Sequence, residues 1–215
     1  MISDTKVVAI GGGTGLSTML KGLKLHTHNI TAVVTVADDG GSSGILRSDL
    51  GMLAPGDVRN CVSALAEVDP VMGELLNFRF KDGSLKGHSL GNLFLAALNE
   101  TSSSFDEAVK KFSHLTGVVG TVYPVTNESV TLSALLEDGR LIEGESHIGV
   151  HHDGPKNGIV KLMVNPEKPK AVDGVIMALE KADIIVLGPG SLYTSIIPNL
   201  LVDGVVDAIK KSNAV

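Results

Sequence analysis

The stretch that most constrains the fold stands almost at the start of the chain, where the apolar run 7–10 (VVAI) leads directly into the glycine-rich residues 11–15 (GGGTG). A continuous apolar run of this kind is typical of a strand buried on both faces of a parallel sheet. Residues 16–23 show helical apolar spacing, and residues 30–36 form a second apolar run. The beginning of the chain therefore predicts a β-α-β unit, with the glycines at the strand end where parallel sheets bind their ligands.

The composition limits the class of protein. A chain of 215 residues with 43% hydrophobic residues, 3% aromatic residues and 25 glycines predicts one α/β domain with an aliphatic core. The net charge of −6 provides no basic field for nucleic acid or for a membrane surface. No apolar run approaches the roughly 18 residues of a transmembrane helix. The single cysteine, Cys61, excludes an internal disulfide and a cysteine-based zinc site. We therefore expect a cytoplasmic protein with no membrane insertion and no nucleic-acid partner.

The rest of the pattern predicts an α/β, Rossmann-like three-layer fold with a mostly parallel sheet and a β-hairpin extension. A polar loop rich in glycine and serine is expected at residues 38–48. Helices are expected at residues 57–68, 71–80, 90–98 and 105–115. Strands at 130–136 and 141–148 form a hairpin within segment 119–150, which either extends one edge of the sheet or is a small insertion. The α/β rhythm resumes with elements at 159–164, 171–181, 184–187 and 201–211.

The last two residues, Ala214 and Val215, have the character of the start of another strand. We therefore expect residues 1–215 to form a single domain that is truncated at its carboxyl end. An unpaired sheet edge at that point is expected to be sticky or poorly ordered.

The first candidate ligand site is the glycine cluster itself. It does not fit a dinucleotide fingerprint, because Leu16 stands where glycine or alanine is needed, and it is no P-loop, because no Gly-Lys-Ser/Thr follows. A glycine-rich turn before a helix still favours phosphate binding. The predicted phosphate-binding residues are Gly12, Gly13, Thr14 and Gly15. The alternative is a tight turn without a ligand.

Two further loops are expected at the same edge of the sheet. Asp38 and Asp39 follow the second strand, where they are predicted to contact a ribose or, tentatively, Mg²⁺; a turn with solvated acids is the alternative. After the strand at 184–187 comes a second glycine-rich turn, predicted to oppose the first across a diphosphate. Its candidate residues are Gly188, Gly190, Ser191 and Tyr193. A purely structural turn containing proline remains the alternative.

Weaker candidates occupy the starts of two helices. Asp57 can cap its own helix, while Arg59 and Asn60 can reach a phosphate, and Asn92 at the start of the helix at 90–98 is a weaker fourth candidate. The tract His151-His152-Asp153 does not favour zinc, because neighbouring strand residues point in opposite directions. Residues 40–44 match Gly-x-Ser-x-Gly but are expected in a loop, so a hydrolase nucleophile is not favoured, and no catalytic residue is assigned.

Taken together, the motifs GGGTG, TVADDGGSSG, PGDVRN, SLGNL and GPGSLYTSIIPNLLV resemble the gluconeogenesis factor family, bacterial proteins related to 2-phospho-L-lactate transferase. The resemblance runs from Val7 to the end of the chain. It implies a Rossmann-like fold, a cytoplasmic protein, self-association as a homodimer or higher oligomer, and binding of a nucleotide sugar such as UDP-N-acetylglucosamine. It also implies a role in cell shape and wall synthesis during growth on gluconeogenic carbon sources.

The same resemblance leaves an enzymatic alternative open. The transferase branch moves a phospholactyl group from a guanosine diphosphate donor to a deazaflavin alcohol with Mg²⁺. The sequence after the acidic pair, Gly40-Gly41-Ser42-Ser43-Gly44, resembles the regulatory branch instead. A nucleotide-sugar sensor and a Mg²⁺-dependent transferase are therefore the two hypotheses, and the family usually continues well beyond Val215.

Overall fold

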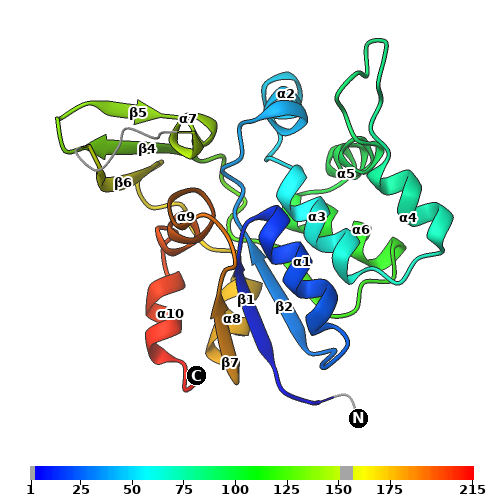
Figure 1. Cartoon of the computed structure of the whole chain (residues 1–215). Helices are drawn as coiled ribbons and strands as arrows, with labels where there is room; N and C mark the ends of the chain where they lie inside the picture. The colour runs from blue at the N-terminus through cyan, green and yellow to red at the C-terminus, as the bar shows by residue number, and fades with distance from the viewer. Residues whose placement is uncertain (1–2, 151–156) are drawn as a thin grey trace.

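A computed structural model describes residues 3–150 and 157–215, and its centre is a four-stranded parallel sheet (Figure 1). The strand order is β3-β2-β1-β7. The strands are β1 (Val7–Gly11), β2 (Ile30–Val34), β3 (Thr121–Pro124) and β7 (Ile184–Leu187). All five residues of β1 are buried, as the apolar run predicts for a central parallel strand. The glycine cluster therefore begins at the carboxyl end of a central strand.

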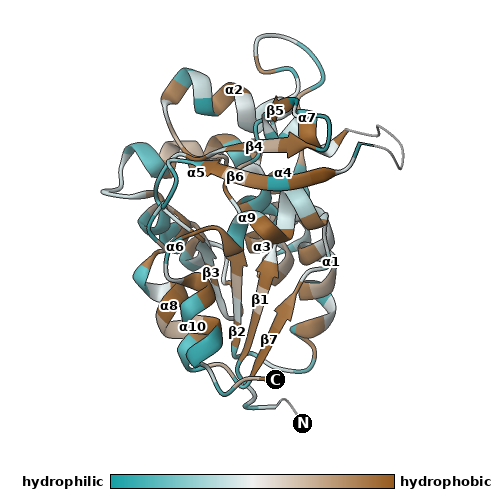
Figure 2. Ribbon diagram, turned by 90° about the vertical axis from the view of Figure 1, so that its left-hand side faces the viewer, coloured by the Kyte–Doolittle hydropathy of each residue, from teal (hydrophilic) through white to brown (hydrophobic). Residues whose placement is uncertain are grey.

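Helices cover both faces of this sheet, so the predicted three-layer α/β fold is confirmed. On one face Ala9 packs with Leu16 and Leu20 of α1 and Phe112 of α6. On the other face Val8 and Ile10 pack with Val175 and Leu179 of α8. Alternate residues of one strand thus serve two separate cores, and Figure 2 shows the apolar strands between the helical layers. The helices on the first side are α1 (Gly13–Leu23), α3 (Gly56–Leu65), α4 (Pro70–Asn77), α5 (Leu90–Glu100) and α6 (Phe105–Leu115), and on the second side α8 (Asp173–Glu180) and α10 (Val205–Lys211).

The predicted hairpin lies in a small antiparallel sheet beyond the carboxyl ends of the parallel strands (Figure 1). Its order is β5-β4-β6, formed by β4 (Thr131–Leu136), β5 (Leu141–Glu143) and β6 (Ile159–Asn165). Two expectations were wrong here. β6 does not continue the parallel α/β rhythm, because it pairs with β4, and the second hairpin strand stops early because residues 145–149 form helix α7 (Glu145–Gly149).

The prediction of a polar loop at 38–48 is also wrong, because residues 41–50 form helix α2 (Gly41–Leu50). Its first two serines, Ser42 and Ser43, are buried and hydrogen-bonded to distant parts of the chain. Asn92 Nδ2 donates to Ser42 Oγ at 3.1 Å, and the Gly56 amide donates to Ser43 Oγ at 3.2 Å. Tertiary hydrogen bonds therefore hold a helix that glycine and serine propensities disfavour.

The carboxyl-terminal region departs from one continuous helix at 201–211. A π-helical turn η1 (Leu192–Ile196) leads into α9 (Ile197–Leu200), and Gly204, with φ +87°, separates α9 from α10. Val215 donates to Asp183 O at 3.1 Å and accepts from the Ile185 amide at 3.0 Å. This is the hydrogen-bond pattern of a parallel strand, as predicted for Ala214 and Val215. Within residues 3–150 and 157–215, no helix is both long and apolar enough to cross a bilayer.

Candidate functional site

A cavity of about 260 Å³ opens where β1, β2 and β7 end. The first glycine loop, the second glycine loop and the acidic residue after β2 all reach it, as expected of a parallel sheet. The predicted residues that line it are Gly12, Gly13, Thr14, Gly15, Asp38, Asp57, Gly190 and Ser191. Pro189, within the second predicted turn, lines it as well, and sequence reasoning missed Glu145 and Ser195, which also do so. We refer to this space as the glycine compartment.

A second space of about 200 Å³ adjoins the first and shares Asp38 and Asp57 with it. The predicted residues Arg59, Asn60 and Asn92 line it. They are joined by Arg79 and by the glycines and serines at the start of α2, including Ser42 and Ser43. We refer to it as the arginine compartment. Both compartments lie at a helix start, which favours anions, but among the described residues only the arginine compartment also contains guanidinium groups.

Close contacts between the two loops explain why the first loop needs glycine. A side chain at Gly15 would place its Cβ 2.7 Å from the Pro189 carbonyl oxygen, and one at Gly12 would lie 2.6 Å from Ser195 Oγ. A Cβ at Gly13 would overlap the carboxylate of Asp57. The two loops therefore oppose each other as predicted, but protein atoms already occupy the space beside Gly12 and Gly13.

Asp57 does not cap its own helix, because α3 has no side-chain hydrogen bond at its N-cap, Pro55. Its carboxylate instead accepts a hydrogen bond from the amide of Gly13 at the start of α1. Burial raises the pKa of this carboxyl to about 7, and repulsion from Asp38 and Glu145 adds to the effect. The Gly13 hydrogen bond and the charge of Arg59 act in the opposite direction. Asp57 is thus a titratable group at the wall between the compartments.

Arg59 is the buried cation of the arginine compartment, with an exposed fraction of 6%. Its Nε donates to Asn92 Oδ1 at 3.3 Å and one terminal nitrogen donates to Asn77 Oδ1 at 2.9 Å. Among the described residues, no ion pair includes Arg59. Burial, together with the charge of Arg79, lowers the pKa of the guanidinium. The side-chain hydrogen bonds that Arg59 forms with described residues go to neutral amides, and the charge of Asp57 opposes the shift, so the guanidinium can still attract an incoming anion.

A hydrogen-bonded chain holds these groups in place. Ser42 Oγ lies 3.0 Å from His88 Nδ1 and accepts from Asn92, which in turn accepts from Arg59. Ser42, His88 and Asn92 are all buried. Sequence reasoning missed His88, although its position next to the N-cap serine of α5, Ser89, placed it beside the Asn92 candidate.

The acidic pair separates into two roles. Asp38 lines both compartments, and its Oδ1 accepts from the Gly40 amide at 3.0 Å. Asp39 lines neither, because its carboxylate accepts from the amides of Glu145 and Ser146, each at 2.9 Å. Asp39 thereby fixes the start of α7 and with it the position of Glu145. In the part of the chain that the structure describes, no group of three or more His, Cys, Asp or Glu residues is arranged to hold a metal ion.

Three remaining predictions concern residues away from the cavity walls. Gly188 has φ +98°, a left-handed conformation that explains its identity and shapes the second turn. Tyr193 belongs to η1, is 36% exposed and lines neither compartment. The tract His151-His152-Asp153 lies outside the described residues.

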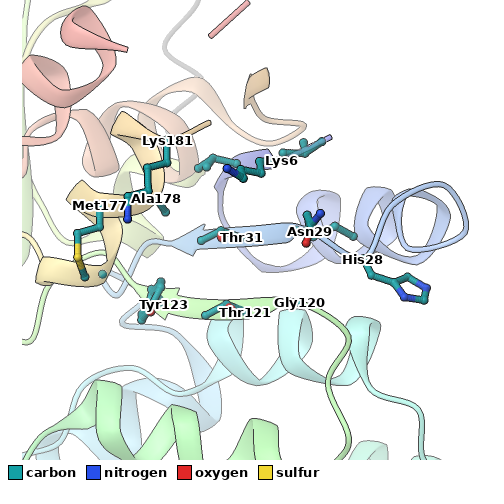
Figure 3. A pocket seen from close by; sticks show the side chains of 14 residues that line it. Lys6, His28, Asn29, Thr31, Gly120, Thr121, Tyr123, Met177, Ala178 and Lys181 are labelled. Atoms are coloured by element: carbon teal, nitrogen blue, oxygen red, sulfur yellow. The ribbon is translucent and has the colours of Figure 1, made fainter. Parts of the chain in front are cut away.

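A larger cavity of about 450 Å³ lies at the opposite, amino-terminal end of the strands (Figure 3). Lys6, Thr31, Tyr123 and Lys181 are among the residues that line it, and none of the predicted site residues does so. Parallel α/β sheets bind ligands beyond the carboxyl ends of their strands. We therefore take the two joined compartments as the candidate site.

The chain belongs to a defined family of proteins. A family model described as "2-phospho-L-lactate transferase CofD" matches residues 7–215, and the chain belongs to this CofD family. Within it, the chain is 57% identical over 214 residues to the "Putative gluconeogenesis factor" of Thermoanaerobacterium thermosulfurigenes, covering 100% of this chain and 66% of the relative. It is 47% identical over 212 residues to the "Gluconeogenesis factor" of Bacillus subtilis, covering 97% of this chain and 65% of that protein.

A solved structure has the same fold. The crystal structure of a Bacillus halodurans member of the UPF0052 family superposes with a TM-score of 0.93 at 46% sequence identity. The match covers 100% of this chain and 68% of that one. The chain thus spans about two thirds of the length of these relatives.

Proposed function

We propose that this chain is the ligand-binding part of a gluconeogenesis factor, a cytoplasmic regulator that binds a nucleotide sugar of the UDP-N-acetylglucosamine type. Its 57% and 47% identity to proteins bearing that name supports the assignment. The role that follows is control of cell shape and wall synthesis on gluconeogenic carbon sources. The observation that carries the ligand class is the pairing of a compartment that contains two arginines with an acidic, glycine-lined one.

The diphosphate is assigned to the arginine compartment. Among the residues that the structure describes, the carboxylates of Asp38, Asp57 and Glu145 line the glycine compartment, and no Lys, Arg or His does. A phosphate placed there would meet like charges in a partly buried space. The neighbouring compartment shares Asp38 and Asp57 but not Glu145, and it adds Arg59, Arg79 and the amino-terminal end of α2, which attract a phosphate. We therefore move the phosphate from the first glycine loop, where the sequence placed it, to the arginines.

The glycine compartment is assigned to the hydroxyl groups of the ligand. Carboxylates accept hydrogen bonds from neighbouring hydroxyls of ribose or hexose rings, as the acidic residue after the second strand does in dinucleotide-binding folds. The backbone of Gly15 and Gly190, which is not buried, lets a ring approach without hindrance from a side chain at these positions. Asp38 lies at the junction of the compartments, where a sugar next to a phosphate would contact it.

A second candidate function is a phospholactyl-type transferase. The observation that favours it is Asp57, since a carboxyl with a pKa of about 7 in a cavity can accept a proton from an attacking hydroxyl. The matching family model carries a transferase description. Under this alternative Mg²⁺ would neutralise the diphosphate, with Asp38, which lines both compartments, as a carboxylate ligand.

One experiment separates the two functions. The purified protein is titrated by calorimetry with UDP-N-acetylglucosamine and with a GDP-linked donor, and each mixture is then analysed for product with and without a deazaflavin alcohol and Mg²⁺. The proposal predicts saturable binding of the UDP-sugar and no turnover. Product from the GDP-linked donor would establish the transferase instead, and binding of neither nucleotide would contradict both.

The cellular role has its own test. A strain lacking the protein is grown on a gluconeogenic and on a glycolytic carbon source and complemented with wild type or with Arg79→Gln. Cell-shape defects confined to the gluconeogenic source, rescued by wild type and not by the variant, are expected. Rescue by both would show that the arginine compartment is not needed for this role.

A further inference from the structure

The face of the parallel sheet that packs against α8 is covered unevenly. Val8 of β1 lies on this face. Thr31 of β2 is its register partner, and Thr121 of β3 is the register partner of Thr31, so the three side chains share the face. Val8 is buried, Thr31 is half-buried and Thr121 is exposed. The cover therefore ends between β1 and β3, and the cavity of about 450 Å³ lies there. We refer to it as the threonine cavity.

Two lysines line the threonine cavity. Lys6 comes directly before β1, and Lys181 is the C-cap residue of α8. The carboxylate of Asp183 accepts a hydrogen bond from the Lys6 amide at 2.7 Å and so holds the backbone at Lys6 close to the end of α8. Figure 3 shows Lys181 on α8, across the cavity from the strands that carry Thr31 and Thr121. Two distant segments of the chain thus bring an ammonium group to one cavity.

Tyr123 of β3 adds a phenol to the wall of the cavity. Its ring lies against the start of α8, where a Cβ at Gly174 would overlap it, so the glycine allows the helix and the strand to approach. The ring is half-buried. Among the described residues, the side chains of Thr31, Thr121 and Tyr123 form no hydrogen bond with another part of the protein. Their hydroxyl groups therefore remain available to donate to, and accept from, a ligand.

The charge of the threonine cavity is opposite in sign to that of the whole chain. Lys6 and Lys181 line it, and none of the Asp and Glu residues that the structure describes does so, although the net charge of the chain is −6. Neither lysine forms an ion pair within the described residues. The carboxyl-terminal end of α8 lies at the same cavity, but a helix end carries only about half an elementary charge. Two full ammonium charges outweigh it, so the cavity favours an anion.

We propose that the threonine cavity is a second ligand site, which binds a small metabolite carrying a phosphate or carboxylate group together with hydroxyl groups. The lysines attract the anionic group, and the threonines and Tyr123 pair with the hydroxyls. The cavity volume is within the range of roughly 300–1,000 Å³ that is usual for small-molecule sites. A floor of threonines is a poor surface for an apolar helix from another chain, because the hydroxyls would be buried without partners.

This site is separate from the glycine and arginine compartments. It lies at the amino-terminal end of the strands, whereas the compartments lie beyond their carboxyl ends. No described residue lines both the threonine cavity and either compartment. The inference therefore holds whether or not the compartments bind a nucleotide sugar.

The test is a titration of the ¹⁵N-labelled protein followed by NMR, because a phosphate could also bind at the arginines and the site of binding must be located. The probes are glycerol 3-phosphate and, in a separate titration, citrate, with uncharged glycerol as the control. The backbone amides of Thr31, Gly120 and Thr121 are expected to shift saturably with at least one anionic probe and not with glycerol. The stronger probe then tells whether the site prefers a phosphate or carboxylates.

Variants connect the shifts to the lysines. Lys6→Gln and Lys181→Gln should each weaken binding at least about fivefold, because each removes a charged donor. The matched control is Lys210→Gln on α10, an exposed lysine outside the cavity, which should bind like wild type. Arg79→Gln should also leave these shifts unchanged.

Three results would overturn the proposal. The first is the absence of saturable shifts at Thr31, Gly120 and Thr121 with both anionic probes. The second is unchanged affinity in the double variant Lys6→Gln with Lys181→Gln. The third is loss of the shifts in Arg79→Gln, which would show that the anion binds in the arginine compartment. The substituted lysines are exposed, and the spectrum of each variant itself shows whether the protein is folded.

Discussion

The carboxylate of Asp57 lies directly against Gly13, filling the space that a side chain at position 13 would need. This contact joins the start of α3 to the start of α1, although the two residues are far apart in the sequence. The sequence of the glycine cluster suggests phosphate binding, but the carboxylate of Asp57 fills part of the space beside it. The same contact helps to shape the site, because Asp57 lines both compartments.

The first prediction concerns glycine 13 itself. Gly13→Ala should lower the free energy of unfolding by about 1–3 kcal/mol, because the methyl group displaces the buried Asp57 carboxylate. The control is Gly22→Ala in the same helix, where no atom lies within 4 Å of the new methyl. That change should stabilise the protein by about 0.5–1 kcal/mol. Urea denaturation measures both, and equal effects would mean that the Asp57 contact does not require glycine.

The second prediction is a pH dependence carried by Asp57. Its pKa in the folded protein, about 7, is above the 3.8 of the unfolded chain, so the folded state keeps a proton that the unfolded state releases. Stability from this group is therefore fully present below about pH 4 and is lost as the pH rises to 7. Asp38 and Glu145 strengthen the shift and Arg59 opposes it.

Asp57→Asn isolates this contribution. The variant should be more stable than wild type at pH 8, by on the order of 1 kcal/mol or more, and the difference should narrow as the pH falls from 7 to 4. Denaturation curves at several pH values give the comparison. A difference that stays constant over this range would contradict a raised pKa at Asp57.

A third prediction assigns Asp39 a positioning role. Asp39→Ala should destabilise the protein by about 1–3 kcal/mol, because two amides at the start of α7 lose a charged acceptor. The exposed Asp82 serves as control, and Asp82→Ala should change stability by less than about 0.5 kcal/mol. Were Asp39 a metal ligand only, its removal would weaken metal-dependent binding and leave the unfolding curve unchanged.

The fourth prediction addresses Mg²⁺. With the diphosphate held by Arg59 and Arg79, UDP-N-acetylglucosamine should bind equally well, within about threefold, in EDTA and in millimolar Mg²⁺. Calorimetry in the two buffers provides the measurement. Binding that disappears in EDTA and is also lost in Asp38→Asn would place a metal ion between Asp38 and the phosphates.

Apolar periodicity was sufficient to predict the core of the fold. The runs at 7–10 and 184–187 and the helix at 105–115 appear as predicted, because buried parallel strands and amphipathic helices have distinctive patterns. The segment at 41–50 could not be recognised as a helix, since Ser42 and Ser43 at its start form hydrogen bonds with Asn92, His88 and Gly56 rather than with neighbours. Likewise, the pattern of residues 159–164 indicates a strand but not which sheet it joins.

The candidate site was predictable only in part, for a similar reason. Loops that follow neighbouring parallel strands must meet at one edge, so Gly13, Asp38 and Ser191 could be placed together. Glu145 reaches the same cavity because Asp39, 106 residues earlier, holds its amide, and no local pattern records such a contact. The contact of the Asp57 side chain with Gly13, rather than with its own helix, likewise depends on tertiary packing and could not be predicted.

The measurement that tests the central claim most directly is the affinity for UDP-N-acetylglucosamine of Arg79→Gln against that of Lys181→Gln. Arg79 is an exposed residue that lines the arginine compartment, whereas Lys181 is an exposed residue of the larger cavity at the other end of the sheet. The account predicts that Arg79→Gln binds at least about tenfold more weakly than wild type, while Lys181→Gln is unchanged. Unchanged binding in Arg79→Gln together with weakened binding in Lys181→Gln would contradict it.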